Sequence, residues 1–242
     1  MYKGIYIALS GAVLKGIQME VITQNLANGN TVGYKKSSVS FEDYLIPRDM
    51  GIQKSDPRDM SRISSQRIDF SGGNLVYTGN PLDIALEGDG FIALEGNLYT
   101  RRGDLKIDGE GFLTNHSGIR VLGSGGKPIR VPDGNIKISD NGTISVDNGN
   151  GEGEEEVGSI RVVGFPKKEN LLKTGEGTFS TVDSPIGSKA VVKQGYLETS
   201  NVDIVMEMFQ MMKTLREFET YQKAIQVFDE ASAKVNNEIA RV

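Results

Sequence analysis

Apolar residues recur every three or four positions at the start of the chain, which is the spacing of one face of a helix. Further apolar residues at Val13, Ile17 and Val21 lie on another side, so a helix over residues 3–27 would need more than one packing partner. Asn28 and Gly29 tolerate the left-handed backbone that ends helices. The stripe consists of Ile5, Ala8, Ala12, Lys15, Met19, Ile22 and Leu26, with one polar position.

A second helix is predicted over residues 201–240, with Ser200 or Asn201 as its N-cap. At about 1.5 Å per residue it would be about 60 Å long, more than the first helix can cover. Its stripe slips after Ile225 in a stammer-like shift and resumes at Phe228. The stripe consists of Ile204, Met208, Met211, Leu215, Phe218, Gln222 and Ile225.

The region between the two helices has a different pattern. Residues 31–75 are polar and irregular, which predicts an extended arm, and residues 76–197 alternate between short apolar runs and Asp, Asn and Gly turns. Three segments are typical of hairpins, namely IALEGDGFIA (84–93), LKIDGEGFLT (105–114) and IKISDNGTIS (136–145). The tract DNGNGEGEEE (147–156) is expected to be a loop.

These patterns predict an α+β protein in which a mainly-β, hairpin-rich domain is flanked by terminal helices that pack like a coiled coil. The predicted domains are an N-terminal helix (1–30), a linker arm (31–75), a β-rich outer domain (76–197) and a C-terminal helix (198–242). Helices that are apolar on more than one side would expose large patches on an isolated monomer. We therefore favour polymerisation through the helices over a helical hairpin folded on the β domain.

Composition excludes several classes of function. The net charge is -5 and the Lys and Arg residues are scattered, so nucleic acid is not an expected partner. Cys is absent, which excludes disulfides and Cys-ligated metals. No uninterrupted apolar run approaches the roughly 18 residues of a membrane span, so we expect no membrane insertion. The helical pattern continues past any signal-peptide cleavage point, so no cleaved signal is expected.

Candidate chemistry is sparse, and we expect neither an enzyme nor a catalytic, cofactor, metal or small-molecule site. His116 lies beside a turn without a nucleophile motif. GSGGKP (123–128) has part of a phosphate-loop pattern, but Pro128 stands where Ser or Thr is needed, so a β-turn is the better reading. The acidic turns lack calcium-loop spacing. The Met cluster at 206–212 is at helical spacing, which favours a core between subunits over a promiscuous binding face.

Four blocks in the right order resemble the bacterial flagellar rod and hook proteins. They are NLANGNTVGYKK followed by FEDYL, GNPLDIALEGDGFIAL, YTRRGDLKIDGEGFL, and QGYLETSNVDIVMEMFQMM before the final helix. The resemblance implies a structural axial subunit of the basal-body rod in the periplasm, with the terminal helices forming an inner tube that transmits torque. Its implied partners are copies of itself, neighbouring rod and hook proteins and the flagellar type III export apparatus. The short insertion between FEDYL and GNLVYTG favours the proximal rod over the distal rod.

Two groups of residues are expected to carry assembly. The first is the helix seam: Ile5, Ala12, Met19, Ile22, Leu26, Ile204, Met208, Met211, Leu215, Phe218 and Ile225. The second is the helix exit and turn: Asn25, Asn28, Gly29, Gly33 and Tyr34. In this turn, positive φ is expected at both glycines if they redirect the chain, with Tyr34 as an anchor and Lys35 and Lys36 facing solvent or acidic neighbours.

A function of another class remains open at this point. The chain could be a secreted β-domain binding module or adhesin that its terminal helices merely oligomerise. Such a binder should display clustered aromatic residues on an exposed β face, whereas the Tyr and Phe residues here are dispersed along the sequence.

Overall fold

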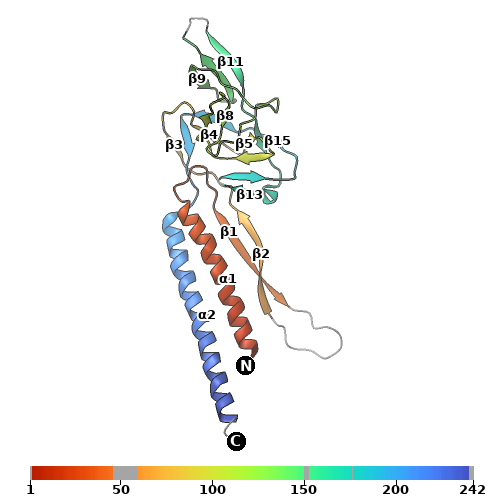
Figure 1. The fold of residues 1–242 in the computed structure, drawn as a ribbon, viewed down its shortest axis with the longest axis vertical. Coiled ribbons are helices and arrows are strands. Elements are labelled where there is room, and N and C mark those ends of the chain that lie inside the picture. Colours follow the sequence, from red (N-terminus) through yellow and green to blue (C-terminus); the bar gives the residue numbers. More distant parts are fainter. Residues whose placement is uncertain (1, 46–58, 150–152, 176, 240–242) are drawn as a thin grey trace. The chain divides into compact units, whose positions relative to one another are not determined.

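The computed structural model describes residues 2–45, 59–149, 153–175 and 177–239, and the side chains of 4–41, 67–149, 153–175 and 177–234 within them. Two helices flank a strand-rich region, α1 (Tyr2–Ala27) and α2 (Ile204–Ile239), which confirms the α+β class (Figure 1). The first strands are β1 (Ser37–Leu45), β2 (Asp59–Ile68), β3 (Leu75–Tyr77), β4 (Ile84–Glu87), β5 (Phe91–Leu94), β6 (Leu98–Thr100), β7 (Lys106–Ile107) and β8 (Leu113–Thr114). They are followed by β9 (Asn135–Ile138), β10 (Thr143–Asp147), β11 (Glu154–Ser159), β12 (Val162–Gly164), the 3-10 turn η1 (Lys168–Asn170), β13 (Leu172–Gly175), β14 (Thr178–Ser180), β15 (Ile186–Gly187), β16 (Val191–Gln194) and β17 (Tyr196–Glu198).

The chain forms two compact units whose boundaries differ from the predicted domains. The helical unit comprises the described residues of 1–27, 37–69 and 203–242, and the β unit comprises those of 28–36 and 70–202. The strands of the predicted arm therefore group with the helices, and the turn after α1 groups with the β unit.

In the helical unit, α1 and α2 pack antiparallel in one continuous register. A Cβ atom added to Gly4 would lie 2.6 Å from Phe228 Cζ, and one added to Gly11 would lie 2.5 Å from Tyr221 Cε1. The two glycines are seven residues apart, and so are the two aromatic residues. The absence of a side chain at each glycine gives room for a ring, so large side chains of α2 fit against small positions of α1.

Polar contacts continue this register to the other end of the pair. Lys15 Nζ lies 2.6 Å from Glu217 Oε2, and Asn25 Nδ2 donates to Glu207 Oε2 at 3.1 Å. Ten residues separate the two α1 positions and ten separate the two α2 positions. No residue is therefore inserted or lost between the first contact at Gly4 and the last at Asn25.

The covered face of α2 follows a regular alternation of four and three. Less exposed positions at this spacing are Glu207, Met211, Thr214, Phe218, Tyr221, Ile225, Phe228 and Ser232, and the adjoining Glu217, Ala224 and Ala231 are also half-buried. The stammer-like shift expected between Ile225 and Phe228 is absent from this face. The predicted stripe included Leu215 and Gln222, which are exposed, where the covered face contains Thr214 and Tyr221. This choice of positions is what made the spacing look irregular after Ile225.

The predicted arm contains a β-hairpin that the polar pattern concealed. Strand β1 pairs antiparallel with β2, from Ser37 opposite Ile68 to Leu45 opposite Asp59, with a register shift between Ser40 and Phe41. Both strands contact α1. Residues 46–58 of the arm lie outside the described residues.

The β unit confirms two of the three predicted hairpins. Strand β7 pairs with β8, and β9 pairs with β10. The hairpin over 84–93 is wrong, because β4 pairs with β16 while β5 pairs with β6 and β12. Residues 84–86 and 91–94 are all buried, so these strands lie inside the fold and turn from one sheet to another. The acidic tract also differs from a simple loop, since Asp147 ends β10 and Glu154 begins β11, with 150–152 outside the described residues.

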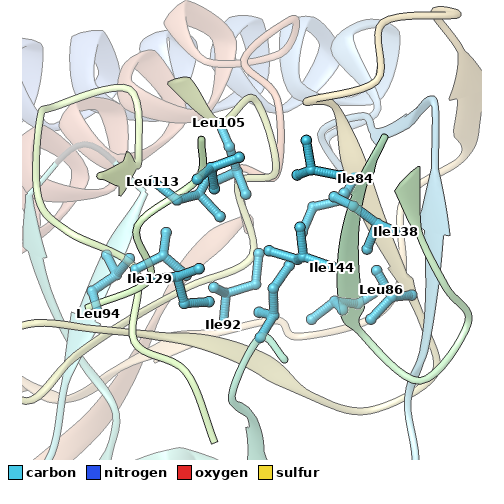
Figure 2. Packing of buried hydrophobic residues seen from close by; sticks show 14 residues of the cluster. Ile84, Leu86, Ile92, Leu94, Leu105, Leu113, Ile129, Ile138 and Ile144 are labelled. Carbon is cyan, nitrogen blue, oxygen red and sulfur yellow. The ribbon is translucent and has the colours of Figure 1, made fainter. Parts of the chain in front are cut away.

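Fourteen buried aliphatic residues fill the core of the β unit. Figure 2 shows side chains from several strands and loops converging, including Ile84, Ile92, Leu113 and Ile144, each 1% exposed or less. The largest sheet has the order β13-β14-β6-β5-β12-β15. The β unit thus has a complete core of its own.

The aromatic residues that are dispersed in the sequence gather inside this unit. The Phe91 ring lies 5.5 Å from Phe70, 5.8 Å from Phe179 and 5.8 Å from Phe165, and Phe165 lies 4.8 Å from Tyr99. These edge and tilted contacts are typical of aromatic packing in protein interiors.

The helix α1 is long and apolar enough over Gly4–Ala27 to cross a membrane by length and composition. This differs from the sequence expectation, which found no apolar run of the length that a membrane span requires. A helix that packs within a soluble protein can meet the same criterion, and here one face of α1 packs on α2.

The glycine contacts of α1 predict which glycine is needed. Gly11→Val should lower the free energy of unfolding by about 1–3 kcal/mol more than Gly16→Val, because the new side chain must displace Tyr221. A Cβ at Gly16 has no neighbour within 4 Å, so this variant controls for valine in a helix. Urea denaturation followed by helical circular dichroism measures both; equal losses would contradict the close contact.

Candidate assembly surface and helix-exit clusters

The helical unit leaves many large apolar side chains in contact with solvent. On α1 these are Tyr6, Ile7, Leu9 and Val13. On α2 they are Ile204, Val205, Met206, Met208, Phe209, Met212, Leu215 and Val227. Most of the α2 set lies in its first twelve residues. Exposed apolar surface of this extent is typical of protein interaction sites.

The structure divides the predicted seam between covered and exposed positions. On α1, Ala12 and Ile22 are buried, and Ile5, Met19 and Leu26 are half-buried. On α2, Met211, Phe218 and Ile225 are half-buried, whereas Ile204, Met208 and Leu215 are exposed. The covered positions belong to the packing of the helical unit itself. A role for any of these residues between subunits stays a prediction.

The chain leaves α1 through a hydrogen-bonded turn. The helix ends at Ala27, as predicted, and the Thr31 N–H donates to the Asn28 carbonyl at 3.1 Å. Of residues 28–36, all of which the structure describes, positive φ occurs at Gly33 (64°) and not at Gly29. The expectation for Gly29 is therefore wrong, because the turn at 28–31 closes with ordinary backbone angles.

A glycine is also needed at position 33 because the neighbouring backbone leaves no room for a side chain there. A Cβ atom at this position would lie 2.8 Å from the carbonyl carbon and oxygen of Arg101 and from the Cα of Arg102. These are backbone atoms, which cannot rotate away. The Gly33 N–H donates to the Glu198 carbonyl at 2.7 Å, which holds the turn against the end of β17.

In the helical unit, Asn25 joins three segments through its side chain. Its Nδ2 donates to the Ser37 carbonyl at 2.8 Å and to Glu207 Oε2, while its Oδ1 accepts from the Ser37 N–H at 3.0 Å. Asn25, Ser37 and Glu207 are all buried. The amide thus satisfies both backbone groups of Ser37 and connects the end of α1, the start of β1 and the start of α2.

In the β unit, Lys35 forms the second polar cluster. Its ammonium donates to Glu198 Oε1 and to the Ser71 carbonyl, both at 2.6 Å, and the same carboxylate oxygen accepts from the Gly73 N–H at 2.9 Å. The side chains of Lys35 and Glu198 are 0% and 2% exposed. Of the two surroundings expected for Lys35, solvent or an acidic neighbour, the structure shows the second, and this neighbour is the carboxylate of a distant segment that the sequence does not place beside it.

Two more groups complete this cluster. Arg101 Nε lies 3.4 Å from Glu198 Oε2, so one carboxylate faces two cations. Lys36, expected to face solvent or acidic neighbours, is half-buried, and its backbone N–H donates to Asn201 Oδ1 at 2.8 Å. Asn201 Nδ2 in turn donates to the Ser71 carbonyl at 3.2 Å.

Tyr34 is buried, and its role as an anchor against the helices or a neighbouring subunit stays a prediction. Lys173 Nζ lies 3.7 Å from the centre of its ring, a cation–π geometry. Burial lowers the pKa of the Lys173 ammonium to about 8. The ammonium is buried without a hydrogen-bond partner among the described residues, so its charge is only weakly compensated.

Sequence reasoning missed most of the polar residues in these clusters. Ser37, Ser71, Arg101, Glu198 and Glu207 were not singled out. One signal for Glu207 was available, because a lone carboxylate in the run IVMEMFQMM occupies the covered stripe of α2. No local pattern distinguishes Glu198 from an exposed strand residue.

The other chemical candidates have structural partners. His116 Nδ1 lies 3.3 Å from Asp104, which Arg102 also contacts through two hydrogen bonds. The Gly126 N–H donates to the Gly123 carbonyl at 2.8 Å, so the segment with a partial phosphate-loop pattern is a turn. Among the described residues, no group of three or more His, Asp or Glu side chains could hold a metal ion.

Comparison with known families shows matches at the helices and in the β unit. A model described as flagella basal body rod protein matches residues 5–35, one for the flagellar hook protein FlgE/F/G D1 domain matches 85–146, and one for the flagellar basal body rod FlgEFG protein C-terminal matches 193–238. These segments include α1 and its exit turn, most of the β-unit core, and most of α2. They define a protein of the flagellar rod and hook class.

Curated relatives extend the match over nearly the complete chain. The chain is 30% identical to the flagellar basal-body rod protein FlgG of Bacillus subtilis, over 98% of this chain and 99% of the relative. It is 31% identical to the flagellar basal-body rod protein FlgF of Mesorhizobium japonicum, over 90% of each. The chain belongs to the flagellar basal-body rod protein family.

The geometry at Gly33 makes a prediction with a matched control. Gly33→Ala should destabilise the β unit by about 1–3 kcal/mol more than Gly96→Ala. Gly96 also has positive φ (80°), but a Cβ there has no neighbour within 4 Å. Both variants therefore carry the backbone cost of a non-glycine residue, about 1–2 kcal/mol, and Gly33→Ala alone must displace the Arg101 backbone. Similar denaturation midpoints for the two variants would contradict this.

The buried ion pair predicts unequal effects of its two partners. Breaking a buried pair costs about 3–5 kcal/mol, and Glu198→Gln should cost more than Lys35→Met. The first change leaves two buried cations, Lys35 and Arg101, whereas the second leaves Glu198 with Arg101. The double variant should cost less than the sum of the single variants. Urea denaturation gives all three values; losses below about 1 kcal/mol would indicate an ordinary surface pair.

Proposed function

We propose that this chain is a structural axial subunit of the flagellar basal-body rod that polymerises through its terminal helices and transmits torque from motor to hook. The observation that carries the proposal is the exposed apolar surface of α1 and α2 in a member of the rod family. A β unit with its own complete core does not need these side chains for its stability. They are therefore available for contacts between subunits, in which the helices would form the inner tube.

Neither a catalytic role nor the binding-module alternative is favoured by the β unit. The clustered aromatic residues expected of a binder are largely internal, since Phe91, Phe165 and Phe179 are buried. The main exposed pair is Tyr77 and Tyr196, with ring centres 5.1 Å apart. An open depression of about 400 Å³ beside β12 and β15 is lined by small, aliphatic and polar residues and one arginine, without an aromatic platform.

Within the rod we propose the proximal position. The alignment with the FlgG of Bacillus subtilis covers 263 positions, more than the 242 residues of this chain, so that relative carries residues that this chain lacks. The alignment with the FlgF of Caulobacter vibrioides covers 251 positions and all of both chains. The resemblance implies that the FlgF type is the proximal-rod protein and the FlgG type the distal-rod protein, so these lengths support the inference from the short segment after FEDYL.

The proposed partners follow from this position. They are other copies of this chain, neighbouring rod and hook proteins, and the flagellar type III export apparatus that would deliver the subunit to the periplasmic rod without signal cleavage. Because α1 forms half of the helical pair, its removal by a signal peptidase would expose the covered face of α2. Delivery of the chain with α1 intact is the route that fits the fold.

Deletion of the gene tests the function and the position together. Cells without this chain should lose swimming in soft agar and regain it when the chain is supplied, and electron microscopy should find basal bodies whose rod is missing or ends within the proximal segment. A short but well-formed rod would place the subunit distally. Unchanged swimming, with the protein in the medium, would favour the secreted binding module. Mass spectrometry of basal bodies should recover peptides of residues 4–15; their absence would contradict export with α1 intact.

A further inference from the structure

The exposed faces of α1 and α2 carry apolar stripes with the same spacing. On α1, Tyr6, Leu9 and Val13 are 58%, 49% and 53% exposed, with steps of three and four residues. On α2, Leu215, Met212 and Met208 are 43%, 49% and 54% exposed, with steps of three and four in the opposite direction of the chain. Each set lies along one side of its helix.

The two stripes lie at different heights along the common axis of the antiparallel helices. Gly4 lies opposite Phe228 and Gly11 opposite Tyr221, so Val13 lies level with residue 219 of the same chain. Met208 is eleven residues further along, which is about 16 Å at about 1.5 Å per residue. The α1 stripe therefore cannot cover the α2 stripe within one molecule.

We propose that the α1 stripe of one copy of this chain packs on the α2 stripe of a second copy, in the same antiparallel sense as within the chain and displaced by about 16 Å along the helices. Tyr6 then meets Leu215, Leu9 meets Met212, and Val13 meets Met208. The mirrored spacing brings all three pairs together at one displacement. This inference rests on the proposed function and assigns residues and an axial offset to its assembly surface.

The arrangement of the stripes favours an open chain of copies over a closed dimer. A two-fold axis along the helices would pair the two stripes without a displacement, and a two-fold axis across the helices would make α1 of one copy parallel to α2 of the other, so neither gives the displaced antiparallel contact. Pairing the α1 stripe with the α2 stripe is therefore heterologous. An assembly of any length has a free α1 stripe at one end and a free α2 stripe at the other, where further copies can add. Both stripes are uncharged over the three paired positions, so no unpaired charge is buried in the contact.

Engineered cysteines test the pairing in purified protein, because the chain has no Cys of its own. The variant Val13→Cys/Met208→Cys is expected to form a ladder of disulfide-linked dimers, trimers and larger species after mild oxidation at concentrations where the protein assembles. A bond within one chain is excluded, since disulfides need Cα atoms within about 7 Å and these levels are about 16 Å apart. The variant Leu9→Cys/Met212→Cys should give the same ladder.

The matched control is Val13→Cys/Gln210→Cys. Gln210 is exposed and lies two residues from Met208, on a different side of α2, so no ladder is expected. Four outcomes would overturn the pairing: equal ladders in the control, dimers from the single variant Val13→Cys, cross-linked monomers, or no oligomer at any concentration. The gene-deletion experiment is independent of these results, so a failed ladder with lost motility rejects this contact and not the rod function.

Discussion

The buried ion pair between Lys35 and Glu198 is the interaction that, inside the β unit, brings together the segments by which the chain enters and leaves this unit. The chain passes between the two units after residues 27, 36, 69 and 202. Through Glu198 Oε1, the Lys35 ammonium and the Gly73 N–H, the pair fixes the exit from α1, the return from the β1–β2 hairpin and the approach to α2. Asn25 joins the corresponding ends inside the helical unit. Each unit therefore joins, through its own buried polar contacts, the ends of the segments by which the chain enters and leaves it.

The two units differ in how completely they bury their apolar residues. The β unit encloses its aliphatic core and its aromatic cluster, whereas the helical unit keeps a row of apolar side chains in solvent on each helix. This difference has a physical cause. A closed set of short strands can surround a core, but two helices can cover only one face of each other. The helical unit is thus stable enough to present its exposed faces and incomplete enough to need neighbours.

The sequence predicted those features that depend on local spacing and missed those that depend on distant partners. The 3.6-residue periodicity placed α1 and its end at Ala27, and turn residues placed the β7–β8 and β9–β10 hairpins. The segment 84–93 failed because an acidic glycine turn between two apolar runs has the same pattern whether the strands pair with each other or diverge. For Lys35 the sequence left solvent and an acidic neighbour open for a related reason: lysine is usually exposed, and only the fold reveals that Glu198 is beside it. Gly33 was correctly selected, but its contact with the Arg101 backbone lies 68 positions away in the sequence and leaves no local signal.

The register of the helical pair also determines when, during synthesis, α1 and α2 can pair and fix the positions of their exposed apolar stripes. Because Gly4 lies against Phe228, α1 can pair with α2 only after nearly all of the chain has been synthesised. The β unit, whose strands lie between them, can acquire its core before α2 has left the ribosome, because domains fold as units while the chain grows. A nascent chain therefore carries α1 without the paired helix that gives the apolar stripes their fixed geometry. The order of the elements along the chain therefore delays the fixed geometry of the surface proposed for assembly until translation is nearly finished.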